Sequence, residues 1–134
     1  MPNHYHLLVS PTTAALSHQM QLLGISFTKA TNRRFDRVGP LFQGQFQAMA
    51  VRSDAQLIWL SRCIHRNPLE AGLEQHIGSW PYTSFPDYLG NRPGSLPSVD
   101  LILRVAGGRA AYRAFVSADS QSPPDEIGRL MLET

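Results

Sequence analysis

Two histidines near the start of the chain have the spacing of metal ligands. His4 and His6 are separated by one residue in the segment His-Tyr-His-Leu-Leu-Val, which we expect to form a strand. Side chains two positions apart on a strand point to the same face, so both imidazoles can reach one divalent cation. Two ligands leave the coordination incomplete, and a third must come from elsewhere in the chain. On spacing alone, two surface histidines are the commoner interpretation.

Cys63 and Asn67 form a second pair with chemical potential. They lie four residues apart in a segment with helical periodicity, so they share one face of the expected helix. Asn67 offers an oxygen ligand and Cys63 offers a thiol. The ordinary alternatives are a small buried apolar side chain for Cys63 and a helix-terminal residue before Pro68 for Asn67. Without further context these alternatives are favoured.

The basic side chains are concentrated in the middle of the chain, whereas the net charge of +2 is itself only a weak indication of function. Six arginines fall in this middle stretch: Arg33, Arg34, Arg37, Arg52, Arg62 and Arg66. Guanidinium groups gathered in this way can neutralise the phosphates of a nucleic acid. A solvated arginine-rich surface is the alternative, and the charge alone favours that alternative.

Several aromatic residues could stack on nucleic-acid bases. They are Phe42, Phe46, Trp59, Trp80 and Tyr82. Most aromatic residues with strand or helix spacing are buried, and we expect Phe27 and Phe46 to belong to the core. Trp59 lies off the apolar stripe of its expected helix, on the side of Cys63 and Asn67.

Alternating elements are expected to position these residues. We expect strands over residues 4–10 and, from the period-two pattern, over residues 41–52. Between them, apolar spacing predicts a helix that Thr12 or Thr13 caps and that ends at about Asn32. Ser53 or Asp54 should cap a second helix, which Pro68 should end. Short helices are expected over residues 99–105 and 108–118, and an amphipathic piece over residues 124–132, after a loop-rich stretch.

Composition limits the class of protein. The length of 134 residues suits one domain with a real core, and no run of eighteen apolar residues predicts a membrane-spanning helix. No signal-peptide pattern opens the chain. The single cysteine excludes an internal disulfide and suits a reducing cytoplasm. We therefore expect a cytoplasmic protein whose function does not involve a membrane.

Four segments, in the same order, resemble the signature motifs of the single-tyrosine, His-hydrophobic-His transposases, most closely the REP-associated group of bacteria. Residues 1–9 read Met-Pro-Asn-His-Tyr-His-Leu-Leu-Val, and residues 39–44 read Gly-Pro-Leu-Phe-Gln-Gly. Residues 64–73 are similar to the family's helix end and following turn, and residues 80–85 to its Trp-Pro-x-Ser-Ser-Tyr segment. The resemblance covers residues 1–90 and leaves residues 91–134 as a loop-rich, then helical appendage.

The resemblance implies an α+β fold, a ferredoxin-like antiparallel sheet with helices on one face. It also implies DNA transposition, in which single-stranded or hairpin DNA is cleaved and rejoined with Mg²⁺ or Mn²⁺. His4 and His6 match the metal ligands, Asn67 matches the third ligand, and the protein would work at the bacterial nucleoid. The expected DNA contacts are Arg33, Arg34, Arg37, Gln43, Arg52 and Arg66.

Three departures from the family pattern bear on activity. The position of the nucleophilic tyrosine is occupied by Cys63, and the basic residues usual at Gln45 and Gln47 are absent. The family's first strand and helix have no counterpart ahead of the histidine motif, so the resemblance implies a sheet that is incomplete at its N-terminal side. An unpaired sheet edge would require a homodimer or another partner to complete it.

Three hypotheses therefore remain open: a strand-cleaving transposase, a DNA-binding remnant without catalysis, and a small zinc protein. In the last, His4, His6 and Cys63 supply the nitrogen and sulfur ligands that zinc prefers. Cleavage of single-stranded DNA separates the first two hypotheses, and zinc content that is lost on Cys63→Ser tests the third.

Overall fold

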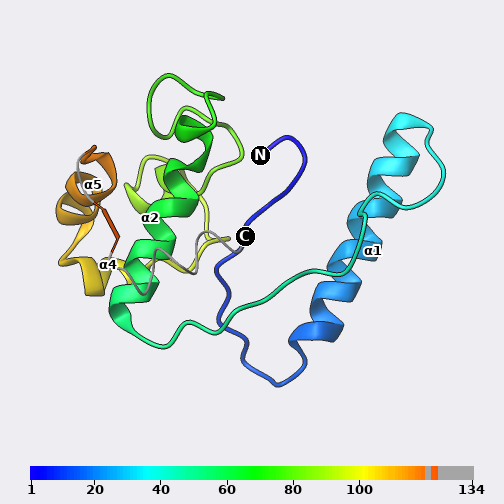
Figure 1. The fold of residues 1–134 in the computed structure, drawn as a ribbon, viewed down its shortest axis with the longest axis horizontal. Helices are drawn as coiled ribbons and strands as arrows, with labels where there is room; N and C mark the ends of the chain where they lie inside the picture. Colours follow the sequence, from blue (N-terminus) through cyan, green and yellow to red (C-terminus); the bar gives the residue numbers. More distant parts are fainter. Residues whose placement is uncertain (120–121, 124–134) are drawn as a thin grey trace. The chain divides into compact units, whose positions relative to one another are not determined.

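The computed structural model describes residues 1–119 and 122–123, and every regular element in them is helical. Helix α1 spans Leu16–Phe35, α2 spans Asp54–Glu70, α3 spans Phe85–Tyr88, α4 spans Asp100–Ala106 and α5 spans Arg109–Ser117 (Figure 1). The described residues contain no strand. The expected ferredoxin-like sheet, with its strands over residues 4–10 and 41–52, is therefore wrong. The expected piece over residues 124–132 lies outside the described residues.

The physical reason is that an alternating sequence describes one strand and does not supply its neighbour. Period-two patterning fits a segment for a half-buried sheet surface, but the hydrogen bonds that stabilise it must come from an adjacent strand. A stable sheet also needs three or more strands or a helix packed on its face. Neither expected strand forms a ladder with any described residue.

The chain divides into two compact units. Residues 1–8 and the chain from Val51 onward form one, called here the helical unit, and Val9–Ala50 form the other, called the α1 unit. In the α1 unit the helix begins after Ala15, so neither Thr12 nor Thr13 is the cap, although the Thr13 hydroxyl accepts a hydrogen bond from the Ala15 amide (3.4 Å). The helix runs to Phe35, three residues beyond the expected end at Asn32. It ends there because Asp36 adopts the left-handed conformation that closes a helix.

Helix α2 begins where the sequence predicts but ends later than predicted. The Ser53 hydroxyl accepts a hydrogen bond from the Gln56 amide (3.2 Å), which confirms the predicted cap. Pro68 does not end the helix, which continues to Glu70. Pro68 lacks the amide that would donate within the helix, but the turn continues beyond it, because the Ala71 amide donates to the Asn67 carbonyl (2.9 Å) and the Leu73 amide donates to the Pro68 carbonyl (2.8 Å).

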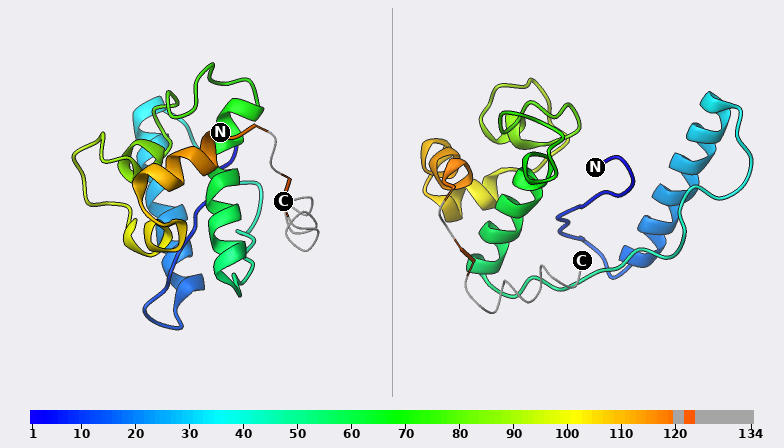
Figure 2. Two further views of the ribbon diagram at one scale, coloured as in Figure 1. Left: turned by 90° about the vertical axis from the view of Figure 1, so that its left-hand side faces the viewer. Right: turned by 45° about the horizontal axis from the view of Figure 1, so that its top comes forward.

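The core of the helical unit is built by α3, α4 and α5 against α2 (Figure 2). Its buried apolar residues are Phe85, Tyr88, Ile102, Leu103, Tyr112 and Val116. The two short helices expected after the loop-rich stretch are confirmed, as α4 and α5. Among the described residues they supply four of the six buried apolar side chains, so the segment expected to be an appendage completes the core around α2. No helix among the described residues is long and apolar enough to cross a membrane.

Candidate nucleic-acid interface and metal ligands

The two histidines of the metal motif lie close together. Their ring centroids are 5.1 Å apart in an edge-to-face arrangement, although the segment that carries them is not a strand. The Asn3 side-chain oxygen is 2.7 Å from His4 Nδ1, and because an amide oxygen can only accept, Nδ1 is the donor of this hydrogen bond. A hydrogen bond of this kind is what commonly orients a metal-bound imidazole.

His6 is held in the form that can bind a metal. Burial, and then the charge of neighbouring His4, lower its pKa below the ordinary value of 6.5. A neutral imidazole has the free lone pair that a cation requires. The pair therefore has suitable chemistry for two of the ligands of one divalent cation.

The other expected ligands lie on α2, in the same unit. Cys63 is half-buried, and burial followed by the negative charge of Glu70 raises the pKa of its thiol above 9.0. Asn67 is partly buried. Within the described residues, no three or more His, Cys, Asp or Glu side chains are placed to hold a metal ion. His4, His6 and Cys63 therefore do not come together as the zinc ligands of the third hypothesis. A site in which the Asn67 oxygen joins the two histidines is not covered by this finding, because Asn is not among those four residue types.

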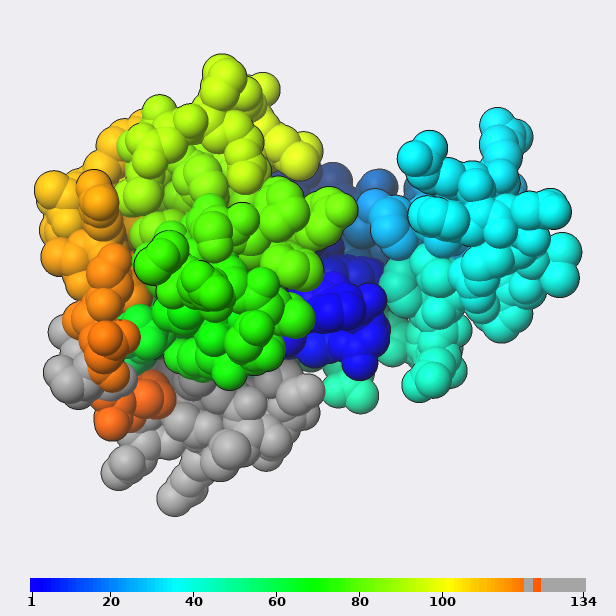
Figure 3. All heavy atoms as spheres, turned by 90° about the horizontal axis from the view of Figure 1, so that it is seen from above, coloured from blue at the N-terminus to red at the C-terminus, as the bar shows by residue number. Residues whose placement is uncertain are grey.

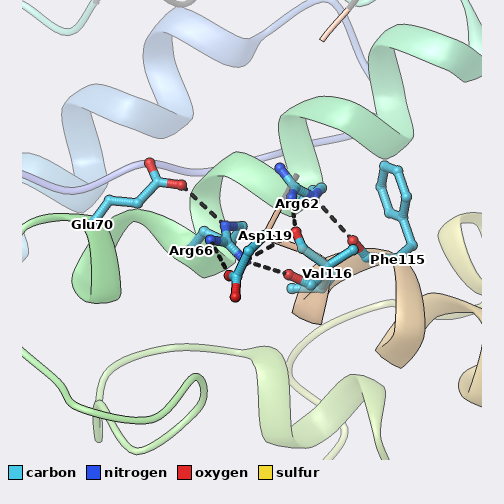
Figure 4. Close-up of polar contacts among 7 residues, drawn as sticks. Arg62, Arg66, Glu70, Phe115, Val116 and Asp119 are labelled. Carbon is cyan, nitrogen blue, oxygen red and sulfur yellow. Dashed lines mark hydrogen bonds and ion pairs between the residues drawn. The ribbon is translucent and has the colours of Figure 1, made fainter. Parts of the chain in front are cut away.

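Two of the six middle arginines are internal. Arg62 and Arg66 project from α2 to the end of α5, where they donate to main-chain carbonyls (Figure 4). Arg62 Nε donates to the Phe115 carbonyl (3.0 Å), and Arg66 Nη1 donates to the Val116 carbonyl (3.0 Å). Arg66 also pairs with Glu70 (3.0 Å). These contacts satisfy carbonyls that the end of a helix leaves without a partner.

Arg66 is consequently placed differently from the DNA contact expected from the sequence. Its side chain is 10% exposed, and its guanidinium also pairs with Asp119 at 3.1 Å. Arg62 lies over the ring of Trp59, which packs edge-on against Phe115. Trp59 therefore belongs to the α2–α5 contact. Arg52, by contrast, is exposed at the start of α2.

The remaining three arginines lie together at the end of α1. Together with two exposed apolar residues they form a surface that we call the α1 tip: Arg33, Arg34, Phe35, Arg37 and Val38. All five are exposed, and no ion pair within the described part of the chain engages their guanidinium groups. In Figure 3 the tip lies among the cyan atoms.

The backbone of the α1 tip is fixed by one side chain. The Asn32 amide nitrogen donates to the Gly39 carbonyl (2.9 Å), and the Arg37 amide donates to the Asn32 carbonyl (2.9 Å). Asp36 and Gly39 both have positive φ, 49° and 92°, which reverses the chain within a few residues. Asn32 therefore holds the turn that carries Arg37 just after the end of the helix.

Charge in the α1 unit is strongly of one sign. Residues 9–50 contain four basic side chains and one acidic one, Asp36, so the unit carries a net charge of +3. The basic residues are Lys29, Arg33, Arg34 and Arg37. Gln43, the remaining expected DNA contact, is exposed in the extended segment that follows the tip. A positive field of this kind attracts a polyanion.

Phe27 and Phe46 are not core residues as expected. Phe27 is 55% exposed and Phe46 is 38% exposed. The Phe27 ring packs only loosely on Phe42, with centroids 6.2 Å apart. Apolar spacing predicted the helix α1, but the core face expected for it is not buried: Leu23 and Phe27 are exposed, and α1 has no buried residue.

The sequence did not predict a buried polar cluster around His65. His65 Nδ1 is 2.7 Å from the Tyr112 hydroxyl and Nε2 is 2.9 Å from the Ser84 hydroxyl. Tyr112 also shares a hydrogen bond with Ser61. Burial lowers the pKa of His65 to about 4. Its position, three residues after Arg62 and four after Ser61 on one helix, was the available signal.

Comparisons with models of protein families, with curated proteins and with solved structures found no match.

Proposed function

We propose that this protein binds single-stranded DNA through the α1 tip and does not cleave it. The observation that carries the proposal is the set of three exposed arginines, free of ion pairs within the described residues, on a unit with a net charge of +3. Guanidinium groups without carboxylate partners release phosphate counterions on binding at little competing cost. The resemblance of residues 1–90 to single-tyrosine transposases supports single-stranded DNA as the ligand class. The protein then works in the cytoplasm, at the nucleoid.

We further propose that His4 and His6, with Asn67, hold one Mg²⁺ or Mn²⁺. The closeness of the two rings, the Asn3 hydrogen bond that orients His4 and the lowered pKa of His6 support two imidazole ligands for one cation. A divalent cation there would offset phosphate charge. The residues of the chain itself supply the orientation: Asn3 fixes the His4 ring, and burial keeps the proton off His6.

The state of Cys63 opposes strand cleavage. The nucleophile in a cysteine-dependent reaction is the thiolate. Burial raises the pKa of Cys63, and the negative charge of Glu70 raises it further, so the thiol predominates at neutral pH. The charges of Arg62 and Arg66 act in the opposite direction but with smaller effect. Binding without cleavage is therefore the function that these residues support best.

A gel assay with a labelled single-stranded DNA hairpin and Mn²⁺ tests both the binding of DNA and the absence of cleavage. The wild type should retard the hairpin and leave it intact, and Arg33→Gln with Arg34→Gln and Arg37→Gln should lose the retardation. Cys63→Tyr restores the tyrosine that the resemblance implies at this position. If only that residue is missing, this variant should form a covalent adduct with the DNA, and the double variant His4→Ala, Cys63→Tyr, its control, should not. Cleavage by the wild type would contradict the proposal, and so would wild-type binding that survives loss of all three arginines.

A further inference from the structure

Phe35 is an aromatic side chain that the fold leaves in solvent. It is the last residue of α1, and it is 65% exposed. Complete burial of a phenylalanine would be favourable by about 2 kcal/mol, so a ring left in water at a fixed position offers surface to a ligand. The neighbouring Val38 is 95% exposed, which extends the apolar surface of the α1 tip.

We propose that Phe35 is a base-stacking residue that makes the α1 tip selective for single-stranded over duplex DNA. The inference rests on the proposed function and adds to it the residue that distinguishes the two forms of DNA. The Arg34 guanidinium lies over the Phe35 ring, 5.9 Å from its centroid. Base, ring and guanidinium can then form one stack, and the other two arginines of the α1 tip, Arg33 and Arg37, contact phosphates elsewhere along the strand.

The chemistry of the two DNA forms explains the selectivity. A single strand can turn a base face toward an aromatic ring while its phosphates contact neighbouring cations, and this combination is general to proteins that bind single strands. In a duplex the base faces are stacked on one another, and only phosphates are available to the tip. Arginines alone would bind both forms, so the ring is the feature that discriminates.

An anionic membrane is the other occupant that a basic helix with exposed apolar residues could have. A helix that lies in a membrane interface carries its apolar residues on one face. In α1 the exposed apolar residues do not share a face: at 100° per residue, Ile25 lies on the opposite side of the helix from Leu23 and Phe27. In the α1 tip the Arg34 guanidinium lies over the Phe35 ring. Both observations favour the nucleic acid.

Fluorescence anisotropy of the full chain tests the inference. The probes are a fluorescein-labelled oligothymidylate and a labelled duplex of equal length, at one low salt concentration. Phe35→Leu should weaken oligothymidylate binding roughly tenfold and leave duplex binding unchanged. Phe35→Tyr, which keeps the ring, should bind both probes as the wild type does. Because Phe35 is exposed, circular dichroism should show the same helix content in all three proteins.

The outcomes separate the inference from the proposed function. If Phe35→Leu binds oligothymidylate as tightly as the wild type, stacking by Phe35 is overturned while DNA binding stands. If Phe35→Leu loses equal affinity for both probes, Phe35 serves the tip in general and selectivity is overturned. If the wild type binds neither probe, the proposed function fails. Wild-type binding to phosphatidylserine vesicles but not to oligothymidylate would assign the tip to a membrane.

Discussion

His65 shows how one buried side chain links the helices of the helical unit. It is only 2% exposed, and its ring lies among Phe85, Tyr88 and Tyr112, with the nearest ring centroid 4.8 Å away. Its two nitrogens contact hydroxyls from α5 and from the residue before α3. No carboxylate contributes to its titration, and burial is the cause of the lowered pKa. The native structure therefore requires the neutral imidazole.

This requirement predicts a pH-dependent stability. The native pKa of His65 is about 4 and the ordinary value is 6.5, so between these pH values the unfolded chain binds the proton and the native protein does not. The stabilisation is complete above pH 6.5 and is lost as the pH falls toward 4, by up to about 3 kcal/mol. Urea unfolding across this range should show the loss in the wild type.

His65→Phe and His76→Gln are the matched variants for that measurement. His65→Phe removes the titrating group and should flatten the profile, although at neutral pH it is less stable by about 1–3 kcal/mol because Ser84 and Tyr112 lose a partner. His76 is exposed, so its substitution should keep the slope of the wild type. Parallel profiles for the wild type and His65→Phe would show that His65 does not carry the dependence.

At the scale of elements, arginines that look alike in sequence have opposite roles. Arg66 joins α2 to the end of α5, whereas Arg33 is exposed at the α1 tip. Arg66→Gln should lower the free energy of unfolding by about 1–3 kcal/mol and leave DNA affinity unchanged. Arg33→Gln should weaken DNA binding and leave stability unchanged. Thermal unfolding and DNA-binding anisotropy on both variants measure these effects. A loss of DNA affinity in Arg66→Gln with intact folding would show that Arg66 contacts DNA.

The turn after α1 predicts a second effect at this scale. Asn32→Ala removes the hydrogen bond to the Gly39 carbonyl that holds the turn, while the helix itself keeps its own hydrogen bonds. The arginines then lose part of their preorganisation, and DNA affinity should fall by roughly threefold. Asn91→Ala, at an exposed asparagine of the helical unit, is the control. Equal affinities for the two variants would mean that Asn32 does not position the tip.

Short-range sequence signals predicted the helices well, whereas the sheet and the burial of individual side chains depend on contacts with distant segments of the chain. The Ser53 cap and the spacing of the apolar residues in α1, α4 and α5 act within a few residues, so the sequence alone locates these helices. A β-ladder depends on a second segment, which alternation over residues 41–52 cannot identify. For the same reason the exposed Arg33 and the buried Arg66 could not be told apart: burial depends on α5, which lies about fifty residues later in the chain.

Over the whole molecule, charge is divided between the two units. The α1 unit carries +3, and the chain as a whole carries +2, so the residues of the helical unit sum to −1. Four arginines of the helical unit are engaged with its own carbonyls and carboxylates: Arg62, Arg66, Arg92 and Arg109. DNA binding should therefore depend on the α1 unit, a property that net charge and the motif resemblance did not reveal.

The salt dependence of oligothymidylate binding tests this central claim most directly. Anisotropy titrations over a series of salt concentrations give the slope of log affinity against log salt for the wild type and for the triple variant at Arg33, Arg34 and Arg37. Each phosphate contact on a single strand contributes about 0.7 to the slope, so the variant's slope should be smaller by about 2. Arg104→Gln with Arg113→Gln, at exposed positions of the helical unit, should leave it unchanged. Equal slopes for the wild type and the triple variant would contradict the claim that the α1 tip binds DNA.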